Sequence, residues 1–277
     1  MSPSPEASAA TESSRLRLAA VREELRGLFV ERDALVDGAL AALVARTHVL
    51  VVGPPGSAKS MLAHEVCRRI VGGTYFQWLL TKFTTPDELY GAISLKGLEH
   101  DEFRRVTTGK LPAAHVVFLD EVFKASSAIL NTLLAIANER VFHNGGRAES
   151  VALISLFGAT NELPDDDDLG ALYDRFLLRY VVEYVEEDFR FLKMLAAPPP
   201  SSEVRATLSL DDLAHLAALA DRVAVPEPLL RDLARLRRGL AEKGVIASDR
   251  RWRAAIPLLR AHAVVGGRDT LGEGDVR

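Results

Sequence analysis

A glycine-rich turn between an apolar run and a lysine is the strongest chemical signal in the sequence. Residues 49–60 read Val-Leu-Val-Val-Gly-Pro-Pro-Gly-Ser-Ala-Lys-Ser. Backbone N–H groups in such a loop and at the start of the following helix point at one spot, where they can bind an anion. Lys59 adds a point charge for the β- and γ-phosphates of a nucleotide, and the Ser60 hydroxyl is a ligand for Mg²⁺. The loop is therefore predicted to hold a nucleoside triphosphate.

The loop departs from the usual phosphate-loop pattern at one position. The pattern G-x-x-x-x-G-K-[ST] has a second glycine where this sequence has Ala58. Residues 48–52 have the apolar pattern of a buried strand and residues 59–71 that of a helix, which is the context that the motif needs. The alternative is a chance turn between a strand and a helix, and this context disfavours it. The predicted nucleotide-binding residues of the loop are Gly53, Pro54, Pro55, Gly56, Ser57, Ala58, Lys59 and Ser60.

Two adjacent carboxylates follow a second apolar run. Residues 116–121 read Val-Val-Phe-Leu-Asp-Glu, so both acids come at the carboxyl end of a predicted buried strand, where ligands bind in open α/β sheets. Asp120 suits a Mg²⁺ partner that acts through water, and Glu121 suits the group that polarises the attacking water. An isolated Asp-Glu pair is more often an ordinary acidic turn. Because a phosphate loop precedes it, the catalytic interpretation is favoured here.

Three further side chains fit the same chemistry. Asn161 follows another apolar run, and its amide has both donor and acceptor atoms with which to hold the lytic water and contact a γ-phosphate. Arg175 and Arg250 carry planar guanidinium groups that bind phosphoryl oxygens bidentately. Taken alone, Asn161 would be a turn residue and each arginine a surface salt-bridge partner. The acidic run at 165–168 is interpreted as a solvated loop before a helix rather than as a metal site.

Five short apolar runs must position these groups. Helical or loop segments separate the runs, which predicts an α/β fold with a five-stranded parallel sheet covered by helices on both faces. The segment 84–112 is too long for a bare crossover, and an elaborated insertion is favoured over a long surface loop. The predicted strands are residues 48–52, 75–80, 115–119, 151–157 and 176–182.

The regions outside the sheet have distinct compositions. Residues 1–14 are rich in Ser, Ala, Pro and Glu and are predicted to be a disordered tail. The nucleotide-binding α/β domain is expected over 15–195, a linker with three consecutive prolines over 196–204, and a small helical domain over 205–277. The helical signals are residues 15–29 and 32–45, a capping box from Ser209, a helix between Pro226 and Gly244, and a helix that begins at Ser248 and has a candidate kink at Pro257.

The bulk composition is that of an ordinary soluble protein. The net charge is −4 and the pI about 6.0, so the chain has no overall electrostatic footprint for nucleic acid or for an anionic membrane. No apolar run is long enough to span a bilayer, and the first residues lack the segments of a signal peptide, which predicts a cytoplasmic location. The single cysteine, Cys67, cannot form an intramolecular disulfide and is expected to be buried. The seven histidines lack metal-ligand spacing, which disfavours a structural zinc site.

Seven motifs follow one another along the chain: Gly53–Ser60, Phe118–Lys124, Ile129–Leu134, Asn138–Arg140, Gly158–Pro164, Tyr173–Arg175 and Ser248–Trp252. Taken together, they resemble those of MoxR-type AAA+ ATPases, and they look closest to the RavA branch. The resemblance covers roughly residues 15–268. Two departures concern the end of the chain: Pro257 interrupts a helix that is expected to continue, and the sequence stops at Arg277, where RavA-like proteins continue. The sequence is therefore expected to be truncated or a short variant.

The resemblance implies a role for each matched position. Lys59 and Ser60 would be the Walker A pair, Asp120 and Glu121 the Walker B pair, and Asn161 sensor 1. The cofactors implied are ATP and Mg²⁺. Such proteins form hexameric rings, in which the insertion 84–112 would face the pore. Arg175 would be the arginine finger, which reaches the nucleotide of the neighbouring subunit. Arg250 would be the sensor 2 residue, with Arg251 as the second candidate.

These features lead to one main expectation and two alternatives. The main expectation is a Mg²⁺-dependent ATPase that couples hydrolysis in a ring to the remodelling of a client or adaptor protein. The resemblance implies a von Willebrand factor A domain protein as this partner. The first alternative is an ATP-gated switch or scaffold with slow turnover. The second, a nucleic-acid translocase or transcriptional activator, has less support because the sequence lacks a basic stripe and a Gly-Ala-Phe-Thr-Gly-Ala loop.

Overall fold

The computed structural model describes residues 5–163, 170–196 and 203–275. The chain forms two compact units, which are considered separately. The sheet unit consists of residues 47–68 and 72–184, and the helical unit of residues 1–46, 69–71 and 185–277.

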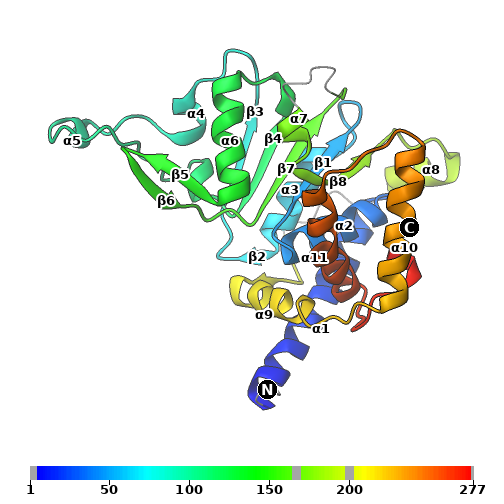
Figure 1. Ribbon diagram of the computed structural model, residues 1–277. Coiled ribbons are helices and arrows are strands. Elements are labelled where there is room, and N and C mark those ends of the chain that lie inside the picture. The colour runs from blue at the N-terminus through cyan, green and yellow to red at the C-terminus, as the bar shows by residue number, and fades with distance from the viewer. Residues whose placement is uncertain (1–4, 164–169, 197–202, 276–277) are drawn as a thin grey trace. The chain divides into compact units, whose positions relative to one another are not determined.

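The sheet unit is built on five parallel strands, as predicted (Figure 1). Their order is β3-β4-β7-β1-β8. The three central strands, β4, β7 and β1, are apolar and mostly buried, which is typical of parallel sheets with helices on their faces. The helix α3 (Lys59–Arg68) follows β1, and α6 (Ser127–Glu139) comes between β4 and β7. The predicted α/β class is confirmed. The strands are β1 (His48–Val52), β3 (Tyr75–Leu79), β4 (Val116–Asp120), β7 (Ser155–Thr160) and β8 (Phe176–Val181).

Two predicted boundaries in the sheet unit are wrong. The strand expected over 151–157 is β7 at 155–160, because only these residues pair with β4 on one side and β1 on the other. Residues 151–154 are apolar too, so the sequence pattern alone could not separate them from the strand. The helix expected over 59–71 ends at Arg68. Ile70 and Val71 form the short strand β2, since β-branched side chains favour extended backbone.

His48 closes the amino-terminal end of β1. The ring is buried, its Nε2 lies 3.0 Å from the Ala137 carbonyl oxygen, and its Nδ1 accepts a hydrogen bond of 3.1 Å from Leu156 N–H. A neutral ring with the proton on Nε2 satisfies both contacts. Burial, helped by the positive charge of Arg140, lowers the pKa of His48 from 6.5 to about 4.

The burial of His48 predicts an acid-sensitive fold. Between pH 6.5 and pH 4 the unfolded histidine binds a proton that the folded one does not, so the free energy of unfolding should fall as the pH falls. This one group should remove about 3 kcal/mol of stability by pH 4. Urea unfolding across this range measures the slope. A His48→Gln variant should show a flatter slope, whereas His100→Gln, at an exposed site, should not; equal slopes in all three proteins would contradict the assignment.

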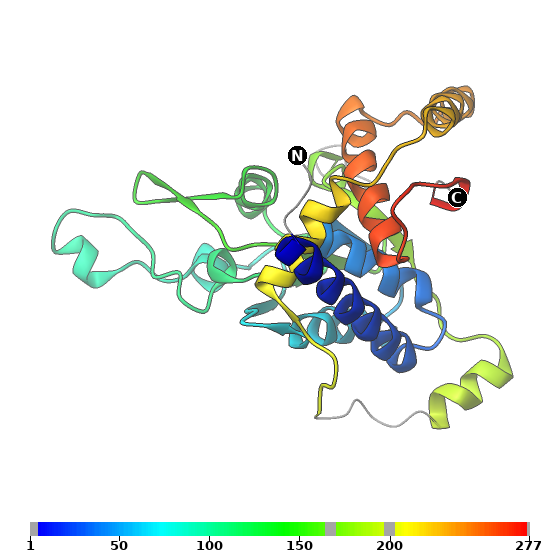
Figure 2. The same ribbon diagram turned by 90° about the horizontal axis from the view of Figure 1, so that it is seen from below.

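An arm and a hairpin extend from the sheet unit. The arm, residues 84–112, contains α4 (Pro86–Tyr90), α5 (Leu95–Leu98) and an antiparallel bridge between Ile93 and Arg105, and a 3₁₀ turn at Leu111–Ala113 closes it. The hairpin, which the sequence analysis did not predict, consists of β5 (Val141–Asn144) and β6 (Arg147–Ser150). Both views show the two elements extending in the same direction (Figures 1 and 2).

The helical unit packs the two N-terminal helices with the C-terminal ones. In Figures 1 and 2, α1 (blue) lies beside α9 (yellow), and α2 and α9 both pack against α11. The short strands β2 (Ile70–Val71) and β9 (Leu208–Ser209) pair in parallel in this unit. Its helices are α1 (Pro5–Leu28), α2 (Asp33–Val44), α8 (Asp188–Ala196), α9 (Leu210–Ala220), α10 (Glu227–Glu242) and α11 (Asp249–Val265), with a final 3₁₀ turn at Glu273–Asp275.

The predicted disordered tail at 1–14 is wrong over residues 5–14, which form the first turns of α1. The cause is a tertiary contact, because the buried Ser14 donates a 2.7 Å hydrogen bond to Asp212 Oδ1. Asp212 also completes the predicted capping box with Ser209, and these donors, opposing its burial, hold the pKa of Asp212 at about 2. A composition without periodicity therefore still forms a helix when a partner surface is present.

The division of the chain also differs from the expected one. The helices α1, α2 and α8 belong to the helical unit and not to the predicted domain at 15–195. Glu24 of α1 contributes to this, because its carboxylate accepts hydrogen bonds from Arg69 (2.7 Å) and from the Ala206 backbone N–H (2.8 Å). The linker predicted at 196–204 falls mainly outside the described residues. The helix α11 continues through Pro257 without ending there.

Candidate nucleotide-binding site

The loop between β1 and α3 is shaped by its glycines. Gly53 donates a 3.0 Å hydrogen bond to the Thr160 carbonyl, and a Cβ atom at Gly53 would lie only 2.2 Å from the carbonyl oxygen of Val182. Gly56 has a φ of +77°, and a Cβ there would have no atom within 4 Å. Gly53 therefore allows the chain after β1 to pass close to the backbone that follows β8, and Gly56 allows the chain to turn where no neighbouring atom is in the way.

Ala58 occupies the position where the usual pattern has a second glycine. Its φ is +64°, in the left-handed region, which costs a residue with a Cβ roughly 1–2 kcal/mol. The loop thus has the backbone conformation that a glycine would adopt more readily. The methyl group is tolerated, and the strain is localised at the residue before Lys59.

Lys59 lies over the loop and is almost fully buried. Its Nζ donates hydrogen bonds to Gly53 O (2.5 Å) and Pro54 O (2.9 Å), and a longer one to Asn161 Oδ1 (3.4 Å). Burial lowers the pKa of Lys59, and the nearby charges of Asp120 and Glu121 oppose that shift. The ammonium group is therefore held at the point where the loop meets the carboxyl edge of the sheet.

The carbonyl groups of the loop are engaged by side chains. In addition to the lysine contacts, Ser57 Oγ donates to Pro54 O (2.8 Å) and Tyr184 Oη donates to Pro55 O (3.0 Å). The backbone N–H groups in the first turn of α3 lack intrahelical acceptors, as at any helix start. Because these loop carbonyls bind side-chain donors, the N–H groups at the start of α3 are the groups that remain to face an anion. Tyr184 was not predicted, since its contact depends on where the chain runs after β8.

The two carboxylates and the asparagine meet at the carboxyl edge of the sheet. Asp120 ends β4, and its Oδ1 accepts a 3.0 Å hydrogen bond from Glu121 N–H. Glu121 adopts a left-handed conformation (φ 51°), and its Oε1 accepts a 2.7 Å hydrogen bond from Asn161 Nδ2. With the contact between Asn161 and Lys59, the side chains form a continuous polar chain. The structure thus brings together the residues that the sequence analysis singled out from three separate segments.

The oxygen donors at this edge fit a Mg²⁺ ion. Ser60 lies in the first turn of α3, next to the loop. Asp120 ends β4, which β7 separates from β1 in the sheet. A hydroxyl and a carboxylate are hard oxygen ligands, which Mg²⁺ prefers together with water and phosphate oxygens. Both side chains have the donor chemistry of a Mg²⁺ site, and Ser60 and Asp120 stay the predicted metal pair.

Arg175 lies at the other end of the sheet. It immediately precedes β8, whose first residue, Phe176, aligns with His48 at the start of β1. Its side chain is 17% exposed, the charged neighbour is Asp174 at 3.8 Å, and its Nε has no hydrogen-bond partner among the described residues. By contrast, the Arg179 guanidinium stacks on the Tyr173 ring at 3.5 Å and donates to two backbone carbonyls.

The remaining predicted residues do not join this cluster. Arg250 and Arg251 lie in the first turn of α11, where Ser248 Oγ accepts a 3.3 Å hydrogen bond from Arg251 N–H. They belong to the helical unit, so their part at a nucleotide stays a prediction. The acidic run at 165–168 lies outside the described residues. Cys67 is buried in α3, as expected, and burial raises the pKa of its thiol to about 11.

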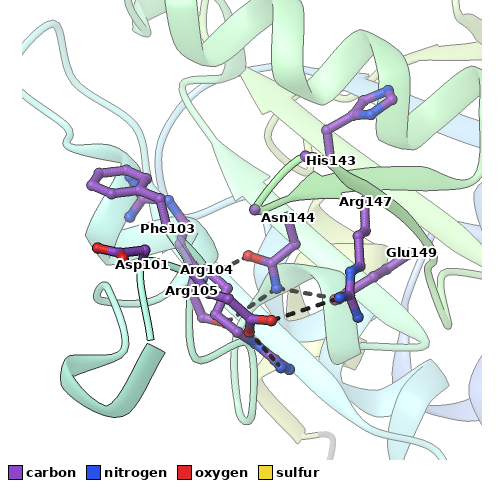
Figure 3. A pocket seen from close by; sticks show the side chains of 11 residues that line it. Asp101, Phe103, Arg104, Arg105, His143, Asn144, Arg147 and Glu149 are labelled. Carbon is purple, nitrogen blue, oxygen red and sulfur yellow. Dashed lines mark hydrogen bonds and ion pairs between the residues drawn. The ribbon is translucent and has the colours of Figure 1, made fainter. Parts of the chain in front are cut away.

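A separate hollow of about 580 Å³ lies between the arm and the hairpin (Figure 3). Asn144 of β5 fastens the two elements: its Oδ1 accepts a 2.6 Å hydrogen bond from Arg105 N–H, and its Nδ2 donates to Arg105 O and to Glu149 Oε2 (both 3.2 Å). Exposed Phe103 and Arg147 line the hollow. None of the predicted nucleotide-site residues lines it, so the hollow is separate from the predicted nucleotide site.

Comparisons with known proteins agree with the motifs. Residues 16–218 match the family model described as the MoxR domain in the MoxR-vWA-beta-propeller ternary systems, and residues 228–277 match an AAA lid domain. The chain is 41% identical over 253 residues to Uncharacterized protein MJ0079 of Methanocaldococcus jannaschii, covering 91% of this chain and 66% of that protein. It is 30% identical over 204 residues to Chaperone MoxR1 of Mycobacterium tuberculosis, covering 71% of this chain and 52% of that protein.

A solved structure supports the fold. A Cytophaga hutchinsonii protein, provisionally described as an ATPase, matches with a TM-score of 0.77 at 17% identity, over 98% of this chain and 86% of that one. The chain spans about two thirds of the length of the archaeal relative and about half that of the mycobacterial one. No helix among the described residues is long and apolar enough to cross a membrane. The sheet with its phosphate loop and the two family matches establish that the chain belongs to the MoxR-type AAA+ ATPases.

Proposed function

We propose that this protein hydrolyses ATP with Mg²⁺ in a ring of identical subunits and uses the reaction to remodel a partner protein. Family membership and the polar chain from Lys59 through Asn161 to Glu121 support the ATPase part. The position of Arg175 supports the shared site and therefore the ring. The assignment to the RavA branch stays a prediction.

Within one subunit, the cluster at the carboxyl edge supplies binding and water activation. The loop amides and Lys59 bind the phosphates, and Ser60 and Asp120 hold Mg²⁺. When bound, the metal neutralises charge on the β- and γ-phosphate oxygens. Glu121 orients the attacking water and accepts its proton, and Asn161 positions that water against the γ-phosphate.

The arginine must act on a neighbouring subunit. β1 is five residues long, which corresponds to about 16 Å at 3.3 Å per residue, and Arg175 lies beyond its amino end while the phosphate loop lies beyond its carboxyl end. An arginine side chain is shorter than that separation. Arg175 can therefore stabilise a transferring phosphoryl group only if the nucleotide belongs to another copy of the chain. This separation is the observation that carries the proposal of a ring.

A second feature supports contact with another protein. The arm presents large apolar side chains to solvent, with Leu95 78% and Phe103 63% exposed. Apolar groups gathered on a projecting element are typical of an interaction surface. The description of the matching family model names systems that combine MoxR with a vWA protein, which supports a von Willebrand factor A domain protein as the partner.

The rival function is an ATP-gated switch or scaffold, in which hydrolysis only resets the bound state. The two functions differ in how turnover responds to the partner. The proposed remodelling function predicts that the partner protein increases kcat, measured as phosphate release at saturating ATP. A slow kcat that no partner changes would favour the switch.

The contact of Tyr184 with the loop yields a smaller prediction. Tyr184→Phe removes the hydroxyl that binds Pro55 O and should raise the Kd for ATP about three- to tenfold, because one hydrogen bond contributes about 0.5–1.5 kcal/mol. Titration with a fluorescent ATP analogue measures the change. Tyr75→Phe is the matched control, since the Tyr75 hydroxyl binds Gln77 on β3 instead of the loop. If the two variants bind ATP equally well, Tyr184 does not support the loop.

A further inference from the structure

Lys124 makes a direct contact with the carboxylate that is assigned to the attacking water. It ends the 3₁₀ turn Val122–Lys124, and its Nζ lies 3.2 Å from Glu121 Oε1. The Lys124 backbone N–H also donates a 2.8 Å hydrogen bond to the Glu121 carbonyl. The lysine side chain is 64% exposed and that of the glutamate only 13%. The ammonium group therefore reaches from the solvent side onto a carboxylate that is mostly enclosed.

Both donors to the Glu121 side chain use the same oxygen. Oε1 receives the Lys124 ammonium and the Asn161 amide, at 3.2 and 2.7 Å. Among the described residues, no donor contacts Oε2. A carboxylate oxygen held from two directions fixes the plane of the group, and the second oxygen stays available to accept a proton from water.

Asn161 cannot hold Glu121 alone throughout the reaction. Its amide also accepts from Lys59 at 3.4 Å, and both groups are assigned to the γ-phosphate. When a phosphate competes for the Asn161 N–H groups, the contact with Glu121 weakens. The Lys124 ammonium is a second donor that belongs to the same short segment as Glu121, so it can keep Oε1 in place while Asn161 turns to the phosphate.

We propose that Lys124 is a positioning residue for hydrolysis, whose ammonium group holds Glu121 Oε1 so that Oε2 faces the attacking water. This inference rests on the proposed ATPase function and assigns to that site a residue for which the sequence analysis predicted no role. It acts through Glu121 and not on the nucleotide. Removing it should therefore change the rate of the chemical step and leave ATP binding intact.

A structural explanation of the same contact makes a different prediction. Exposed ion pairs three residues apart contribute about 0–1 kcal/mol to stability and often have no function. If that were all, replacing Lys124 would alter the thermal midpoint slightly and kcat not at all. The kcat measured separately from KM distinguishes the two explanations.

The test uses Lys124→Met, which keeps most of the side-chain length and removes the charge, and Lys124→Arg, which keeps the charge. At saturating Mg·ATP, Lys124→Met should lower kcat about tenfold or more, up to the 10²–10⁴-fold that a positioned base contributes. KM and the Kd for an ATP analogue should stay within about twofold of the wild type. Lys124→Arg should recover part of the rate. Lys243→Met, at an exposed lysine of the helical unit, is the matched control and should keep full activity.

A double variant makes the test independent of simple loss of folding. In a Glu121→Gln background, Lys124→Met should cause no further loss of the small residual kcat, measured at high enzyme concentration, because Lys124 acts through the carboxylate that is already absent. A Lys124→Met protein with wild-type kcat, while Glu121→Gln is inactive, would overturn this inference alone. If wild-type protein and Glu121→Gln turn over ATP equally, the proposed function itself fails. A rise in KM at unchanged kcat would instead assign Lys124 to nucleotide binding and would also overturn the inference.

Discussion

Glu121→Gln should abolish ATP turnover while the protein still binds ATP. Glutamine keeps an oxygen that can accept the hydrogen bond from Asn161 Nδ2, so the local geometry is preserved. It removes the carboxylate that accepts a proton from water, and a positioned general base contributes about 10²–10⁴-fold to a rate. Phosphate release gives kcat, and a fluorescent ATP analogue gives the Kd, which should change by less than about threefold.

The matched control for this variant is Glu242→Gln, which removes an exposed carboxylate at the end of α10. It should retain wild-type kcat and Kd. Glu121→Gln would contradict the assignment if it kept the wild-type rate. Loss of ATP binding together with activity would point instead to a structural role of Glu121 in the loop.

Arg175→Ala should suppress turnover by about 10³–10⁵-fold in an otherwise intact assembly, the range found when such an arginine is removed from other NTPases. The guanidinium stabilises charge that develops on the transferring phosphoryl group, so its loss affects the rate more than binding. The Kd of the subunit's own nucleotide should stay close to that of the wild type, because Arg175 lies at the opposite end of the sheet from the phosphate loop.

Two further variants sharpen the result for Arg175. Arg175→Lys keeps the charge but loses the planar fork, and it should remain strongly impaired. Arg235→Ala removes an exposed arginine on α10, whose partner is Asp232 at 2.9 Å, and it should be fully active. Wild-type turnover by Arg175→Ala would show that the residue has no part in the reaction.

The sequence predicted those parts of the site in which local pattern and chemistry agree. The phosphate loop, the acids after β4 and the asparagine after β7 each follow an apolar strand, so the parallel sheet necessarily brings them to one edge. The meeting of Lys59, Asn161 and Glu121 follows from that topology. The contacts of Lys124 and Tyr184 were not predicted, since they depend on how the turn after Glu121 and the chain after β8 fold back.

The parts of the fold that were missed have two different causes. The hairpin had a usable local signal, because Gly145 and Gly146, with φ values of 58° and 77°, form a two-residue turn between short extended segments. The start of α1 had none, because Ser14 contacts Asp212, nearly two hundred positions away. Glu24, near the other end of α1, makes similarly distant contacts with residues 205–206. Contacts at that separation decide the division into units, and no local pattern records them.

A mixing experiment with two inactive variants tests the shared active site most directly. Lys59→Ala lacks the phosphate-loop charge but keeps Arg175, and Arg175→Ala keeps the loop but lacks the arginine. If both are combined in equal amounts and assemble at random, roughly a quarter of the interfaces pair an intact loop with an intact arginine from the neighbour. The account predicts that ATP turnover of the mixture rises well above the sum of the two separate activities. If assemblies that contain both variants are no more active than that sum, the account is contradicted.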